Sequence, residues 1–217
     1  MSLGIDLLAG VKLLIPLILS LTVHEFAHAW SAWRLGDDTA SRLGRLTLNP
    51  LAHIDPIGTL LLPLLGIPFG WAKPVPVDAT RFRRSVNMST GMMITAAAGP
   101  LANVALAVLC TVGYGLLIRF APGAAMPGSG SHELLLNLIQ LNVALAIFNM
   151  IPIPPLDGSR VVEGLMPLRF RSAWEGFTRY APFLLLAVLV GARYIMAGPM
   201  GAAYGLLDRL LNVVVGA

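Results

Sequence analysis

Long apolar stretches, separated by short polar ones, dominate the pattern along the chain. They predict membrane helices at residues 7–33, 88–118, 134–150 and 181–198, and a last span or an interfacial helix at 200–217. In the first stretch, residues 13–23 include only Ser20 and Thr22 as polar side chains, so this helix is apolar on every side, as expected inside a membrane. Residues 1–10 lack the basic region of a signal peptide, so we expect the first helix to be retained.

The pattern changes between the first two long stretches. Residues 36–56 are more polar and alternate weakly, which favours a short hairpin or a re-entrant loop. Residues 57–69 are apolar but shorter than the roughly 20 residues of a span, so we expect a re-entrant segment or a half-helix. In residues 70–78, two prolines hold the backbone extended and remove amide donors, which excludes a central strand but allows an edge strand.

The composition also indicates a membrane-embedded protein rather than a soluble one. The chain is 56% hydrophobic and 12% charged, with a mean hydropathy of +0.76, whereas soluble domains have about 25% charged residues. We therefore expect an all-α polytopic membrane protein with about five to six membrane segments and short re-entrant or β-hairpin elements between the first and second core helices. The single cysteine, Cys110, excludes an internal disulfide, and the arginines form no face that would bind nucleic acid.

Charge placement predicts the orientation of the helices. If the first helix runs from outside to inside, 11 of the 15 Lys and Arg residues lie on the cytoplasmic side, as the positive-inside rule requires. These 11 are Arg34, Arg42, Arg45, Lys73, Arg81, Arg83, Arg84, Arg160, Arg169, Arg171 and Arg179. The same orientation places His28 and Asp157 at one depth, each near the cytoplasmic end of a helix.

The first helix carries a candidate metal-binding motif, His24-Glu25-x-x-His28. Residues four apart lie on one helix face, so both imidazoles can bind one metal ion. Glu25 lies about 100° around the helix, beside the ion rather than bound to it, which suits a general base acting on a metal-activated water. The less specific alternative is a pair of structural histidines in a packed core.

A third ligand is expected after the helix at 134–150. Three prolines within residues 152–155 cannot continue a helix, so the chain unwinds and presents Asp157 before a glycine turn. An Asp-Gly pair alone would indicate a surface turn, but beside a two-histidine site it favours a metal ligand. A zinc ion bound by His24, His28 and Asp157 would offset the cost of placing two carboxylates in the membrane, and it would leave a fourth position for water.

Together these motifs resemble the site-2 protease family of intramembrane zinc metalloproteases over nearly the whole chain. The resemblance rests on His24-Glu25-x-x-His28, on Gly99-x-x-x-Asn103, and on Asn149-x-x-Pro-x-Pro-x-Leu-Asp157-Gly. It implies one Zn²⁺ per chain with Asp157 as the third ligand, and Glu25 as the catalytic base. It also implies regulated intramembrane proteolysis, that is, cleavage within or near transmembrane helices of membrane-protein substrates.

We further expect a single membrane-embedded metalloprotease domain at residues 1–217, in a prokaryotic cell membrane, and the placement of Lys and Arg predicts an active site toward the cytoplasm. Larger members carry PDZ or CBS domains that this sequence lacks. Asn149 and Asn103 match family positions near the active site, where they are candidates for substrate or oxyanion contacts. For Asn103, a structural hydrogen bond between helices is an equal alternative. His53 is either a solvated loop residue or a polar group at the edge of the active site.

A transmembrane substrate has to unwind before its peptide bonds can be attacked, because a helix holds its carbonyls in internal hydrogen bonds. The freed backbone groups then need partners, which an open strand edge beside the metal would supply. Residues 42–48 and 73–78 are two candidates for this edge. We favour the second, with Val75 and Val77 as the pairing residues.

Two other functions fit parts of the pattern. A membrane protein that binds or transports zinc without hydrolysis would carry several acidic or histidine residues along a path through the bilayer, and the sequence has one such cluster. An inactive scaffold that binds helices would not require Glu25.

Overall fold

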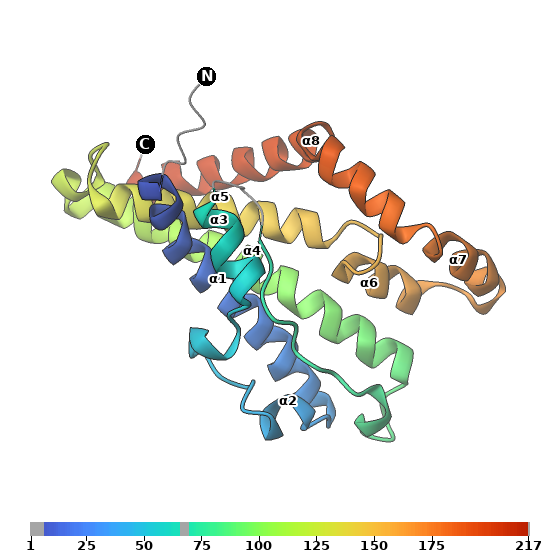
Figure 1. Ribbon diagram of the computed structural model, residues 1–217. Coiled ribbons are helices and arrows are strands. Elements are labelled where there is room, and N and C mark those ends of the chain that lie inside the picture. The colour runs from blue at the N-terminus through green and yellow to red at the C-terminus, as the bar shows by residue number, and fades with distance from the viewer. Residues whose placement is uncertain (1–6, 66–69, 217) are drawn as a thin grey trace.

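The structure, a computed structural model, describes residues 7–65 and 70–216 (Figure 1). Its four longest helices are α1 (Leu7–Leu35), α4 (Met88–Phe120), α5 (Gly130–Asn149) and α8 (Ala181–Val215). All four are long and apolar enough to cross a membrane, which takes about 20 residues. The described residues therefore form an all-helical membrane protein with four candidate spans.

The sequence predicted about five to six membrane segments, and the difference arises mainly at α8. The expected segments 181–198 and 200–217 are joined, through residue 215, in one continuous helix with Pro199 inside it. Figure 1 shows α8 bending along its length. A proline removes one backbone hydrogen bond and kinks a helix, but neighbouring groups in a membrane protein compensate, so it need not end the helix.

Helix α4 is the central element of the bundle, in contact with α1, α5, α6 and α8. Glycines allow several of these close contacts. A Cβ atom at Gly115 would lie 2.7 Å from Cγ1 of Val214 in α8, and one at Gly164 of α6 would lie 2.5 Å from Cβ of Met93 in α4. Small residues have this role where helices pack in lipid, since the hydrophobic effect does not drive them together there.

The connection from α1 to α4 contains no β-strand in its described residues, so the predicted hairpin is not confirmed. It contains α2 (Thr39–Arg42) and three short turns of helix, η1 (Pro50–Ala52), η2 (Pro56–Leu61) and η3 (Ala79–Arg81). At 42–48 the expected strand is replaced by a helix end: Gly44 has a φ of 67°, and the N–H of Arg45 returns to the carbonyl of Ala40. The weak alternation of apolar and polar residues in this segment therefore reflects turns and not a strand.

Residues 56–64 form the short η2 and then α3 (Leu62–Leu64), as the half-helix alternative predicted, while residues 66–69 of the same prediction lie outside the described residues. Residues 1–6, which belong to the prediction of a retained first helix, also lie outside them. Residues 71–78 form neither helix nor strand, have no partner strand among the described residues, and run as an extended connection in Figure 1. This segment is held by side chains of α1 and of the loop that follows it.

After α5 the chain unwinds at the prolines, as predicted, and continues in α6 (Asp157–Leu165), η5 (Leu168–Phe170) and α7 (Arg171–Thr178). Asp157 opens α6 rather than a turn, so the expected glycine turn was wrong. The reason is packing: a Cβ atom at Gly158 would lie 2.2 Å from the carbonyl oxygen of Met150. The glycine therefore allows α6 to start directly against the end of α5.

Candidate metal centre

Side chains from two distant parts of the sequence converge where α1, α4 and α6 meet. His24 and His28 lie on one face of α1, and their Nε2 atoms are 3.0 Å apart. Oδ2 of Asp157, at the start of α6, is 3.2 Å from Nε2 of His24 and 3.4 Å from Nε2 of His28. They form the one group of three or more potential metal ligands among the described residues.

A hydrogen bond on the far side of each imidazole determines which ring nitrogen carries the proton. Nδ1 of His24 lies 2.6 Å from Oδ1 of Asn103, and Nδ1 of His28 lies 2.7 Å from the carbonyl oxygen of Thr95. Both oxygens accept, so in each neutral ring Nδ1 donates and Nε2 carries no proton. The two Nε2 lone pairs and the Asp157 carboxylate therefore face one another without a proton between them, as metal ligands do.

The size of this triangle fits a zinc ion. Tetrahedral zinc with bonds of about 2.0–2.1 Å to nitrogen and oxygen separates its ligand atoms by about 3.3 Å. The three observed distances bracket this value. Oδ2 of Asp157 is also buried without a hydrogen-bond partner among the described residues, which a cation would compensate.

The Asp157 carboxyl has the charge that a metal ligand requires. Burial alone would raise its pKa, but the two neighbouring imidazoles lower that pKa to about 2 when they carry protons on Nε2, and a metal cation in place of those protons acts in the same direction. Asp157 is therefore an anion at neutral pH, and metal ligands must be deprotonated.

Glu25 is buried beside this group but belongs to a different set of contacts. Its side chain is 8% exposed, and Oε2 accepts a hydrogen bond of 2.8 Å from the N–H of Val75 in the extended segment. The carboxylate is thus fixed by a backbone donor. Two residues that the sequence placed in separate roles, catalytic base and substrate edge, are in direct contact.

Gly99 is a functional position to which the sequence analysis assigned no role. A Cβ atom there would lie 2.5 Å from Nε2 of His28 and 2.7 Å from Cε1 of His24. Helix α4 can therefore approach the two imidazoles only because this residue has no side chain. The sequence feature that could have indicated this role is the run of small residues around Gly99-Pro100. Close packing between helices accounts for such a run equally well.

We expect Gly99→Ala to weaken zinc binding by more than tenfold, because the new methyl group displaces the two imidazoles from their shared geometry. Substitution of residues that hold metal ligands in place costs about 10–100-fold in metal affinity. Zinc content of the purified protein, measured across a chelator series, checks this result. Gly113→Ala on the same helix is the matched control, since nothing lies within 4 Å of the Cβ position there. Equal zinc retention in both variants would contradict the prediction.

Asn103 lies in a buried polar network rather than at an exposed surface. It is fully buried, accepts from His24, and donates to the side chain of Asn142 at 2.7 Å and to the carbonyl of Ser20 at 3.3 Å. Asn142 in turn donates to Oγ of Ser20 at 2.8 Å. The amide links α1, α4 and α5 while orienting His24, so the hydrogen bond between helices is favoured over the substrate or oxyanion contact.

His53 is buried, at 2% exposure, so the expectation of a solvated loop residue was wrong. Its Nε2 donates to the carbonyl of Thr47 at 2.9 Å, and its own carbonyl accepts from the N–H of Lys73 at 2.9 Å. These contacts hold the loop, and they disfavour a substrate contact as well. Asn149 is partly buried at the end of α5 and donates to the carbonyl of Leu145 at 3.0 Å; its substrate or oxyanion role stays a prediction.

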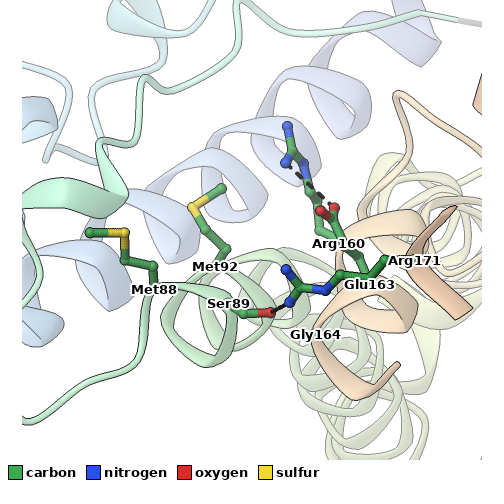
Figure 2. A pocket seen from close by; sticks show the side chains of 7 residues that line it. All are labelled: Met88, Ser89, Met92, Arg160, Glu163, Gly164 and Arg171. Atoms are coloured by element: carbon green, nitrogen blue, oxygen red, sulfur yellow. Dashed lines mark hydrogen bonds and ion pairs between the residues drawn. The ribbon is translucent and has the colours of Figure 1, made fainter. Parts of the chain in front are cut away.

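A pocket of about 220 Å³ lies between the start of α4 and helices α6 and α7 (Figure 2). Its lining residues are Met88, Ser89, Met92, Arg160, Glu163, Gly164 and Arg171. None of the predicted site residues is among them. Arg160 pairs with Glu163 at 3.6 Å, and Arg171 donates to Ser89 across the pocket at 3.4 Å. The pocket is therefore separate from the metal group, and its α6 residues lie about one to two turns beyond Asp157.

Comparisons with known proteins agree on one family. Residues 114–191 match the family described as Peptidase family M50. The chain is 38% identical to "Putative zinc metalloprotease YwhC" of Bacillus subtilis over 93% of this chain and 91% of that protein. It is 32% identical to "Putative zinc metalloprotease Rip2" of Mycobacterium tuberculosis (strain H37Rv), over 88% and 71%. Rip2 of Mycolicibacterium smegmatis is 38% identical over 67% and 54%. No solved structure gives a significant match.

Proposed function

Because the chain belongs to peptidase family M50, the site-2 protease family, we propose that it is an intramembrane zinc metalloprotease that hydrolyses peptide bonds within or near transmembrane helices of membrane-protein substrates. Regulated intramembrane proteolysis is the process in which such cleavage would act. The observation that carries the proposal is the convergence of His24, His28 and Asp157 with the geometry of a zinc site. Three protein ligands are typical of catalytic zinc, whereas structural zinc takes four.

Each site residue has a defined task in this reaction. His24, His28 and Asp157 would hold one zinc ion, which supplies a Lewis acid able to lower the pKa of a water toward 7. Glu25 takes a proton from the attacking water and returns it to the leaving amine. Asn103 and Thr95 orient the two imidazoles through their Nδ1 atoms. The fully satisfied network behind His24 keeps this arrangement rigid in a medium without water.

The extended segment 73–78 is our candidate for the edge that pairs with the backbone of the unwound substrate. Its amide donors differ in availability: Lys73 donates to His53, Val75 to Glu25 and Asp78 to Asp37, and the two prolines have no N–H. The N–H of Val77 has no acceptor among the described residues. A substrate strand that enters beside Glu25 would find this donor available, and backbone pairing of this kind tolerates varied side chains.

Val77→Pro removes that donor, and we expect it to raise KM about 3- to 10-fold, the worth of one backbone hydrogen bond of about 0.5–1.5 kcal/mol. Zinc content should not change. Val77→Ala is the control, because it shortens the side chain but keeps the N–H. Cleavage kinetics of a purified transmembrane reporter measure the effect. If Val77→Pro has the kinetics of the control, Val77 is not part of the substrate edge.

The membrane setting supports an active site on the cytoplasmic side of a prokaryotic cell membrane. His28 lies in the last third of α1 and Asp157 follows α5, and Figure 1 shows α2, α6 and α7 at the end of the bundle opposite η4 (Pro122–Ala125). Most of the Lys and Arg residues belong to the connections at this end, as the positive-inside rule requires of a cytoplasmic end.

The main alternative, a membrane protein that binds or transports zinc without hydrolysis, makes a different prediction. Purified, zinc-loaded protein in detergent or vesicles is incubated with a reporter that contains one transmembrane helix. Our proposal expects cleavage within or near that helix, faster when helix-breaking residues lie near the scissile bond. Stoichiometric zinc without any cleavage would favour the alternative, and a chain without zinc that binds the reporter would favour an inactive scaffold.

A further inference from the structure

Arg45 is a buried cation whose guanidinium hydrogen-bonds only to backbone carbonyls among the described residues. Its side chain is directed at the extended segment, and the residue is 7% exposed. Nη2 donates to the carbonyl of Lys73, and to that of Pro74 at 3.5 Å. Nε of the same guanidinium is buried without a hydrogen-bond partner among the described residues, so the contacts of Nη2 with these carbonyls are what offsets the burial of the charge.

The second of these carbonyls belongs to the peptide group that contacts the catalytic carboxylate. The C=O of Pro74 and the N–H of Val75 are the two ends of one planar unit. Nη2 of Arg45 makes a long hydrogen bond of 3.5 Å to the oxygen end, and Oε2 of Glu25 accepts one of 2.8 Å from the nitrogen end. A single rigid group thus connects a permanent cation to the general base.

Two further contacts fix the segment on either side of this group. The N–H of Lys73 donates to the carbonyl of His53 at 2.9 Å, and the N–H of Asp78 donates to the carboxylate of Asp37 at 2.7 Å. Asp37 is fully buried. These anchors hold the two ends of the segment, and Arg45 adds a contact next to the first of them, at the peptide group that faces Glu25.

We propose that Arg45 is a positioning residue for hydrolysis: it fixes the Pro74–Val75 peptide group and through it orients the carboxylate of Glu25. The inference rests on the proposed role of Glu25 as the base. Arginine suits the task because its planar, always charged guanidinium can engage two carbonyls at once. The ammonium of a lysine would retain the charge but not this fixed geometry.

The test compares Arg45→Gln with Arg45→Lys in the full-length protein, with the transmembrane reporter as substrate. We expect Arg45→Gln to lower kcat about 10–100-fold, the usual range for loss of an outer-shell contact, with KM near that of the wild type. Arg45→Lys should recover part of kcat. Zinc content should stay at the wild-type value in both, since α1, α4 and α6 supply the contacts of the metal ligands. Arg84→Gln, an exposed arginine of the same connection, is the control.

Amide hydrogen exchange supplies a second readout that does not depend on activity. In peptides covering residues 73–78, only Lys73, Val75, Val77 and Asp78 have an exchangeable backbone amide. Arg45→Gln should speed exchange at Val75, and Arg45→Lys should speed it less. Unchanged kcat with unchanged exchange in Arg45→Gln would overturn the inference. Loss of zinc together with activity would also overturn it, because Arg45 would then support the fold as a whole.

A third outcome, a raised KM with normal kcat, would assign Arg45 to substrate holding instead and would equally overturn its role in orienting Glu25. Failure of the proposed function would give a different result. The wild-type protein would then not cleave the reporter, whereas Arg45→Gln would still speed amide exchange at Val75.

Discussion

Glu25→Gln should lower the rate of substrate cleavage by about 10²- to 10⁴-fold, the usual contribution of a positioned general base. The substitution is selective for proton transfer. Gln has nearly the shape of Glu, and its side-chain oxygen can still accept the hydrogen bond that the N–H of Val75 gives to Oε2 of Glu25. The variant should therefore keep its fold and most of its zinc while its amide cannot take a proton.

Measurement of kcat and of zinc content on the same preparation decides this prediction. Glu163→Gln is the matched control, because Glu163 lies on α6, outside the metal group, and pairs with exposed Arg160. Cleavage by Glu25→Gln at the wild-type rate would remove Glu25 from the role of base, and with it the proposed mechanism. Loss of zinc together with activity would make Glu25 part of the metal site instead.

Asp157→Ala should have the largest effect on the metal. It removes one of three converging ligands, and the only one that carries a negative charge, so zinc affinity should fall by more than the 10–100-fold that outer-shell substitutions cost. Cleavage should be lost with the ion. The two histidines would remain in place, because Asn103 and Thr95 hold their Nδ1 atoms independently of Asp157.

Zinc analysis of Asp157→Ala in a chelator series measures this loss. Asp208→Ala, an exposed acidic position on α8, controls for the removal of one negative charge from the chain. Retention of zinc and of cleavage by Asp157→Ala would exclude Asp157 from the site and would require a different third ligand.

The sequence predicted the helices and the spacing within them because both depend on local periodicity. His24 and His28 share a face simply because four residues make about one helical turn. Asp157 could be placed near them only through topology and the family resemblance, because its position depends on where α5 ends and α6 begins. In the structure, contacts such as the close approach of Gly158 to Met150 determine that position.

The connection between α1 and α4 was predicted less well, because contacts distant in sequence determine it. Segment 73–78 is held by Asp37, Arg45 and Glu25 rather than by a neighbouring strand, and alternation along a chain carries no information about such partners. Likewise, the sequence shows that Asn103 is polar at membrane depth. It does not show that both ends of its amide are already occupied by His24 and by Asn142.

The central claim is that one zinc ion, held by the converging residues, is required for hydrolysis. Its most direct test is to remove zinc from the purified wild-type protein with a chelator and then titrate zinc back while following cleavage of the transmembrane reporter. We predict no cleavage by the metal-free protein and a recovery that rises with added zinc and saturates at one ion per chain. Cleavage that persists without metal, or that saturates at another ratio, would contradict the account.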